Sequence, residues 1–250
     1  MNKLLMITAI HKEYWLPDDK MYLPVQVGNG ESLGIIRDNA GDNIAEKNAN
    51  YCELTAMYWA YKNLKMYDYI GFDHYRRHFA NGYIGTKKSR VAGFKDIEKY
   101  LREDVVLLPK ARNYRIETNY SQYSHAHNEV DLIKTREVIG DLYPEYVKAF
   151  DSYMTQTIGH RFNMMIMSKA IFLDYSKWLF DILFEIEKRL DISTYSDYDK
   201  RVFGFISERL LDVYLSQNKI SYIELPYVYM DMENWVMKIY KFMQRKLRNV

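Results

Sequence analysis

Residues 67–79 read YDYIGFDHYRRHF, and the character of the chain changes abruptly halfway along them. The first six residues are mostly aromatic and aliphatic and predict a buried strand, whereas the rest combine an acid, two histidines and two arginines. Open α/β sheets bind ligands beyond the carboxyl ends of their strands, where anionic substrates are usually held. Arginine suits phosphate, and an acid with a histidine can hold a divalent metal. The alternative interpretation is a solvated strand end without a ligand.

Size and composition indicate a globular protein with one large core. The chain has 250 residues, of which 48% are hydrophobic and 16% aromatic, and its 24 tyrosines include side chains suited to sugar or base sites. The single cysteine, Cys52, excludes an internal disulfide and a cysteine-rich zinc site, and it fits a reducing cytosol. A net charge of only +2 gives weak attraction to nucleic acid, so no nucleic-acid partner is expected.

Strand and helix patterns alternate along the chain and predict an α/β fold, in which helices flank a central, mostly parallel sheet. Helical periodicity is expected to be interrupted near Pro144. Residues 110–128 carry few apolar anchors and predict a mobile loop or lid. Apolar runs predict strands at 4–10, 67–72, 104–109, 163–167 and 220–225, and helical spacing predicts helices at 44–65, 93–103, 129–157, 170–190 and 202–217.

The tail at 235–250 predicts a basic amphipathic helix that follows a single domain at 1–234. Such a helix can lie on an anionic membrane surface, or it can dock on the protein's own core. No stretch reaches the roughly eighteen apolar residues that a bilayer span needs, and residues 3–10 are too short for a secretion signal. We therefore expect a cytoplasmic protein that is peripheral on the inner face of the cell membrane.

Several common signatures of α/β enzymes are absent from the sequence. It contains no GxGxxG after the first strand, no GxxxxGK[ST], no GxSxG and no HExxH. Dinucleotide oxidoreductases, P-loop kinases, common serine hydrolases and zincins are therefore disfavoured. An α/β enzyme that holds phosphate through side chains or a metal remains.

A succession of motifs resembles a family of bacterial capsule and exopolysaccharide glycosyltransferases, long catalogued as a domain of unknown function, which includes galactofuranosyltransferases. The motifs cover nearly the whole chain and are DNI (42–44), ELTAMYW (53–59), YIGFDHYRR (69–77), RFNMMIM (161–167), WLF (178–180) and ERL (208–210). The resemblance implies a GT-A-like nucleotide-sugar-binding sandwich, a UDP-sugar donor and a lipid-linked oligosaccharide acceptor. It implies sugar transfer during capsule or exopolysaccharide synthesis, with galactofuranose as one candidate sugar and inversion as the expected outcome.

In the resembling fold the donor nucleotide lies beyond the first strands. Successive strand side chains alternate, so one of Arg76 and Arg77 is expected to face the diphosphate while the other braces the sheet. Asp73 and His74 are the predicted ligands for Mg²⁺ or Mn²⁺, although many GT-A enzymes carry Asp-x-Asp where this chain has Asp73-His74-Tyr75. The donor contacts that the resemblance implies are Thr8, Ala9, His11, Asp38, Asn39, Asp73, His74, Arg76 and Arg77.

Inverting transfer needs a base that removes the proton of the acceptor hydroxyl, usually a carboxylate. Glu208 is the predicted base because apolar neighbours on its helix could desolvate it, and the alternative is a surface Glu paired with Arg201 or Arg209. Asp199 is the second candidate, and His160 in the polar cluster at 160–163 is the third. The residues expected to bind sugar or acceptor are His127, Arg161 and Asn163.

Two other functions stay open. A metal-dependent phosphohydrolase would also use Asp and His near strand ends, but the six histidines are dispersed along the chain. A non-catalytic polysaccharide-binding protein would account for the aromatic residues without accounting for a large α/β core. The oligomeric state is also open, with a homodimer among the options.

Overall fold

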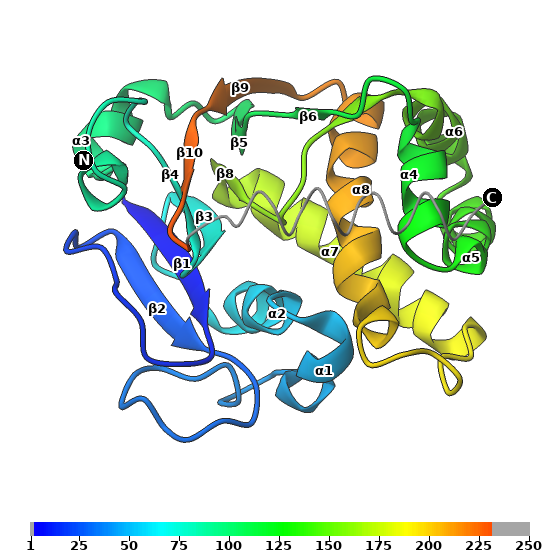
Figure 1. Ribbon diagram of the computed structural model, residues 1–250, viewed down its shortest axis with the longest axis horizontal. Coiled ribbons are helices and arrows are strands. Elements are labelled where there is room, and N and C mark those ends of the chain that lie inside the picture. Colours follow the sequence, from blue (N-terminus) through cyan, green and yellow to red (C-terminus); the bar gives the residue numbers. More distant parts are fainter. Residues whose placement is uncertain (1–2, 232–250) are drawn as a thin grey trace.

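The computed structural model describes residues 3–231, and an eight-stranded mixed sheet lies at its centre (Figure 1). β1 lies between β2 and β3, β8 lies between β3 and β5, and β9 forms an edge beside β5. β4 and β10 extend the sheet from the end of β3. The strands are β1 (Leu4–Ile10), β2 (Tyr22–Gln26), β3 (Tyr69–His74), β4 (Arg77–Phe79), β5 (Val105–Pro109), β8 (Met165–Ser168), β9 (Ser221–Leu225) and β10 (Tyr227–Tyr229).

The prediction of an α/β fold with a mostly parallel sheet is confirmed. β1, β2, β3, β5, β9 and β10 run in one direction, whereas β8 and β4 run in the opposite direction. The reversed strand β8 is inserted between β3 and β5, so its amino end lies at the same edge of the sheet as their carboxyl ends.

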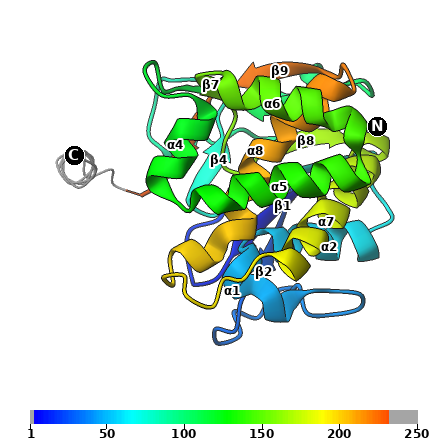
Figure 2. The same cartoon turned by 90° about the vertical axis from the view of Figure 1, so that its right-hand side faces the viewer.

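More helices cover one face of the sheet than the other. In Figure 1, α1 and α2 lie beside β1 and β2, whereas α4, α5 and α6 gather on the far side of α8. Figure 2 shows these three helices as an outer layer over α7 and α8. The helices are α1 (Asn48–Tyr51), α2 (Leu54–Asn63), α3 (Phe94–Ile97), α4 (Asn119–Ala126), α5 (Glu129–Leu142), α6 (Val147–Thr155), α7 (Lys169–Arg189) and α8 (Val202–Gln217).

Strand alternation divides the apolar side chains between two cores. Ile70 and Met167 point into the large core under α2 and α5 to α8, whereas Tyr69 and Ile166 join a smaller core on the face covered by α3. The sheet is closely packed here, since a methyl group added at Gly71 would meet the Met6 sulfur at 2.7 Å. Within the described residues, both faces of the sheet are packed against apolar side chains.

Several predicted elements agree with the structure. α8 has the predicted bounds, and Pro144 begins a short 3-10 turn that separates α5 from α6. The predicted helix at 44–65 is divided at Cys52, which adopts φ 54° between α1 and α2.

Two predictions about loops are wrong. The segment 110–128 is not an open lid, because it contains strand β6 (Arg112–Asn113), which pairs with β7 (Ile158–Gly159), and the packed helix α4. The Thr118 hydroxyl accepts a hydrogen bond from Ser121 N–H at the start of α4, and Tyr123 is fully buried. The second lies between the predicted strand at 4–10 and the predicted helix at 44–65, where no strand was expected: β2 forms there because its backbone pairs with β1 despite Pro24.

Two predictions concern a membrane: the absence of a membrane-spanning stretch and the amphipathic helix at 235–250. Within residues 3–231, none of the helices combines the length and apolar character that crossing a bilayer requires. The amphipathic helix predicted at 235–250 lies outside the described residues.

Candidate functional site

A cavity of about 490 Å³ opens beyond the carboxyl ends of β1, β2 and β3. Parallel strands present their carboxyl ends at one edge, and the residues that follow them form the cavity. α1 and the segment before α8 close the other side. The lining residues are His11, Val27, Gly28, Asn29, Gly30, Asn48, Ala49, Cys52, Glu53, His74, Arg76 and Arg201.

Two arginines line the cavity, one from the strand ends and one from the segment before α8. Arg76 follows β3 and pairs with Asp231 at 3.6 Å, and Arg201 donates to the Cys52 sulfur at 3.1 Å. Burial, with the charge of Arg76 adding to it, lowers the pKa of His11 and lowers the pKa of His74 to about 2. Both imidazoles are therefore neutral near pH 7, and the two guanidinium groups supply the positive charge. Such a group favours an anionic ligand.

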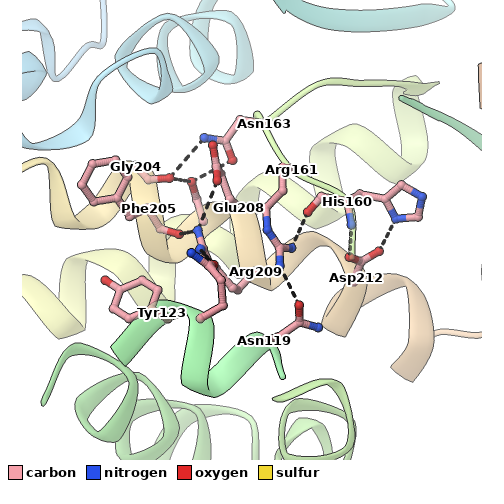
Figure 3. A network of polar contacts seen from close by, with 12 residues as sticks. Asn119, Tyr123, His160, Arg161, Asn163, Gly204, Phe205, Glu208, Arg209 and Asp212 are labelled. Carbon is pink, nitrogen blue, oxygen red and sulfur yellow. Dashed lines mark hydrogen bonds and ion pairs between the residues drawn. The ribbon is translucent and has the colours of Figure 1, made fainter. Parts of the chain in front are cut away.

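The cavity lining also carries a carboxylate, Glu53. Its Oε1 accepts a hydrogen bond from Asn163 Nδ2 at 2.8 Å, and Asn163 is fixed in turn by the Ser207 hydroxyl at 2.8 Å. Burial raises the pKa of Glu53, and the negative charge of Glu208 on α8 adds to the rise. Glu208 itself accepts from Arg209 Nη1 at 3.1 Å. Figure 3 shows Asn163, Gly204, Glu208 and Arg209 together at one end of this polar network.

Asp73 lies beneath the cavity and does not line it. Its Oδ1 accepts from the Thr8 hydroxyl and its Oδ2 hydrogen-bonds to His78 Nδ1, each at 2.7 Å, and the side chains of Asp73 and His78 are fully buried. Asp73 and His74 are successive strand residues and point to opposite faces. They therefore do not form the predicted metal site. Among residues 3–231, no group of three His, Cys, Asp or Glu side chains is placed to hold a metal ion.

The other predicted nucleotide contacts also lie outside the cavity lining. Thr8 is engaged by Asp73, and the carbonyl of buried Ala9 accepts from Tyr75 N–H at 3.2 Å. Asp38 is 1% exposed, and its backbone N–H donates to the Gln26 carbonyl. Asn39 lies exposed on the adjacent turn. Of the donor contacts implied by the resemblance, the structure brings His11, His74 and Arg76 together.

Arg76 and Arg77 occupy different environments, the division expected from strand alternation. Arg76 lines the cavity, whereas the Arg77 guanidinium lies 3.6 Å from the Phe162 ring centroid. Burial lowers the pKa of Arg77, and the charge of Glu208 opposes that change. Arg77 thus packs between β4 and the segment that precedes β8.

The side chains of the polar cluster at 160–163 point in different directions. Phe162 and Asn163 adopt φ values of 84° and 50°, which are uncommon for residues other than glycine, and this turn aims Asn163 at Glu53. Buried Arg161 instead donates to the Tyr153 hydroxyl at 2.5 Å and to Asn119 Oδ1 at 2.6 Å. Arg161 is therefore an internal brace in this structure and does not face the cavity.

His160 lies in a separate cavity of about 430 Å³. Its Nδ1 bonds to Asp212 Oδ1 at 2.6 Å (Figure 3). Its Nε2 bonds to Glu224 Oε1 at 3.2 Å. Burial opposes protonation, but the two carboxylates outweigh it and raise the pKa of His160. His160 thus lines this second cavity and not the one beyond β1, β2 and β3, although its partner Asp212 follows Glu208 by one turn of α8.

An aromatic group borders the cavity near Glu208. The His127 ring stacks on Phe205 at 4.1 Å and on Tyr198 at 5.7 Å, and His127 Nδ1 lies 3.5 Å from Asp199 Oδ1. Burial lowers the pKa of His127 to about 4, so the ring is neutral near pH 7. The Arg201 guanidinium lies 5.3 Å from the Phe205 ring centroid, which links this aromatic group to the cavity. His127 and Asp199, expected at the acceptor and catalytic sites, are thus neighbours here.

Sequence reasoning missed Glu53 and Arg201 as cavity residues. Glu53 lies in the ELTAMYW motif, but its contact with Asn163 joins positions 110 residues apart. From the sequence, Arg201 is expected only as an ion-pair partner of Glu208. The Gly28-Asn29-Gly30 turn was the available signal for a backbone that approaches a ligand closely, since Gly28 adopts φ 77°.

Comparisons with known proteins agree on the fold. A family model described as a domain of unknown function (DUF4422) matches residues 5–219. The apo structure of WbbM, described as a bifunctional glycosyltransferase, is 30% identical and superposes with a TM-score of 0.85 over 93% of this chain. The match covers 46% of the WbbM chain, so this chain spans about half of that protein. A comparison with curated proteins gives no match.

The role of Thr8 can be tested by Thr8→Val, which keeps the side-chain shape and removes the donor to Asp73. A buried carboxylate oxygen then loses a partner, so the free energy of unfolding should fall by about 1–3 kcal/mol in urea denaturation. Thr194→Val, at an exposed threonine, is the control and should have little effect. If Thr8→Val instead weakened UDP binding and left stability unchanged, Thr8 would be a nucleotide contact.

The buried imidazole of His74 should make the folded state sensitive to acid. The unfolded ring takes up a proton near pH 6.5, whereas the folded ring stays neutral down to about pH 2, so stability falls as the pH drops below 6.5. His74→Asn should remove up to about 1.4 kcal/mol per pH unit from this slope between pH 6 and 4. Urea titrations across this range measure it, and parallel slopes for the two proteins would contradict the assignment.

Proposed function

Because this chain belongs to the DUF4422 family and resembles the WbbM glycosyltransferase over nearly its whole length, we propose that it is a glycosyltransferase. One observation carries the proposal. The cavity beyond β1, β2 and β3 is lined by Arg76 and Arg201 together with the carboxylate of Glu53. Transfer from an activated sugar requires a cationic place for the leaving group and an acid–base group near the acceptor.

The donor that fits a cavity lined by two arginines is a nucleoside diphosphate sugar, which we take to be a UDP-sugar with galactofuranose as the candidate sugar. A cavity of about 490 Å³ suits a ligand of this size. Arg76 and Arg201 would bind the diphosphate, and the neutral rings of His11 and His74 would add hydrogen bonds. Negative charge grows on the diphosphate as the sugar leaves, so the two arginines stabilise the transition state more than the bound donor.

The acceptor side is the aromatic group formed by His127, Tyr198 and Phe205. Tyr198 is 56% exposed, and aromatic faces of this kind stack against sugar rings. A lipid-linked oligosaccharide at the inner face of the membrane is the proposed acceptor, within capsule or exopolysaccharide synthesis.

Glu208 is the proposed general base. It lies one helical turn from Phe205 on α8, its side chain is 22% exposed, and its charge acts on Glu53 and Arg77. In an inverting step the acceptor hydroxyl gives its proton to the Glu208 carboxylate as its oxygen bonds to the anomeric carbon. The bond from that carbon to the diphosphate breaks on the opposite face, and UDP leaves with the bonding electrons. Glu53, which lines the cavity, is the alternative base.

Mg²⁺ or Mn²⁺ has no assigned step in this scheme. Both oxygens of Asp73 are occupied by Thr8 and His78, so the residues after β3 do not fit the two-ligand site that the sequence suggested.

Removing the Arg76 side chain tests the donor site. Arg76→Ala deletes a charge-assisted contact and should weaken UDP binding by roughly 1.5–3 kcal/mol, measured by calorimetry. Arg136→Ala, on the exposed surface of α5 and paired with Asp151, removes the same side chain without touching the cavity and should bind UDP like the parent. Unchanged UDP affinity in both Arg76→Ala and Arg201→Ala would place the donor elsewhere.

The base is tested by separate Glu208→Gln and Glu53→Gln variants. Glu208→Gln keeps the size of the side chain and removes the proton acceptor, so kcat for sugar transfer should fall roughly 10²–10⁴-fold with UDP affinity retained. A comparable fall in Glu53→Gln alone would move the role to Glu53. If both variants transfer sugar at the parental rate, neither carboxylate is the base.

A further inference from the structure

The loop between β4 and α3 carries an apolar tip in water. Tyr83 is 63% exposed and Ile84 is 95% exposed. Gly85 follows them with φ 110°, and a methyl group there would meet the Ser89 hydroxyl at 2.7 Å, so the loop turns tightly behind the tip. A single exposed apolar side chain needs no explanation, but two adjacent ones at the end of a tight turn form a small projecting surface.

Cations surround this tip. Lys87, Lys88 and Arg90 follow it in the same loop, and Lys110 Nζ lies 5.3 Å from the Tyr83 ring centroid. Within residues 3–231, none of these four side chains forms an ion pair with a carboxylate. Lys87 and Arg90 donate to backbone carbonyls, and Lys88 lies over the Trp15 ring. Their positive charge is therefore available to an external anionic surface.

Asp231 contacts both the loop that carries the tip and the cavity. Lys87 Nζ donates to the Asp231 carbonyl at 2.5 Å, and the carboxylate of Asp231 pairs with Arg76 at the cavity. The Tyr14 hydroxyl also donates to this carboxylate at 2.8 Å. A surface that receives the loop would therefore lie beside the cavity.

We propose that Tyr83 and Ile84 insert into the interface of an anionic lipid bilayer, with Lys87, Lys88, Arg90 and Lys110 at the level of the headgroups. Aromatic and aliphatic side chains partition into this region, and nearby cations add attraction to acidic lipids. A stable protein partner needs a far larger contact area than two side chains provide, whereas interfacial insertion does not. The proposal does not depend on the reaction in the cavity, and it is separate from the segment at 235–250.

Vesicle flotation of the full chain tests the loop. The probe is phosphatidylcholine vesicles with and without phosphatidylglycerol, at low and physiological salt. Tyr83→Ser with Ile84→Ser should reduce partitioning onto the anionic vesicles by roughly tenfold or more. Met66→Ser is the matched control, because Met66 is 80% exposed before β3, at the end remote from the cavity, and it should float like the parent. Equal flotation of the double variant and the parent, or no binding of the parent, overturns the proposal.

A fluorescent label separates loop insertion from binding by another segment. Ile84→Cys and Met66→Cys, each in a Cys52→Ser background, are labelled with an environment-sensitive dye such as NBD. Addition of anionic vesicles should brighten and blue-shift the dye at position 84 and leave the dye at position 66 unchanged. If the labelled protein floats while the dye at position 84 stays in water, membrane contact occurs elsewhere and the proposal fails.

Discussion

A carboxylate buried between three strands holds the ligand edge of this protein together. Asp73 on β3 receives the Thr8 hydroxyl from β1 and bonds to His78 on β4, with no solvent contact at its side chain. A charge in such a place is tolerated only when its oxygens are partnered, so the three strand ends must keep one relative position. Because Asp73 is fixed in this way, His74 and Arg76, which follow it along the chain, point toward the cavity.

The same site brings together charges that suit group transfer. Two guanidinium groups and a carboxylate line the cavity, while burial keeps the imidazoles of His11 and His74 neutral. Asn163 holds Glu53 in place through a hydrogen bond, and the strained turn at Phe162 makes that contact possible. Strain of this kind persists when the surrounding packing fixes it, here by Arg77 on the Phe162 ring.

The local sequence pattern predicted those features of the fold that depend on interactions between residues close in the chain. The alternation of strands and helices, the bounds of α8 and the break at Pro144 follow from periodicity and from proline's missing donor. It could not reveal that the Asp73 oxygens are occupied, because Thr8 is 65 residues away. It also could not separate His160 from Asn163, since a backbone turn between them leaves His160 in the second cavity and directs Asn163 to Glu53. A cavity lies at the edge where the ligand site is predicted, and the long-range partners of its lining residues required the folded chain.

The reversed direction of β8 has a consequence for how this sequence can diverge. Ligand-facing residues follow the forward strands β1, β2 and β3, but they precede β8, because its amino end shares their edge. Insertions just before β8 would displace Asn163 and with it Glu53. Insertions just after β8 would fall at the opposite edge, where Ser168 caps α7. Relatives of this protein should therefore differ in length after β8 more freely than before it, the reverse of what a uniformly parallel sheet would allow.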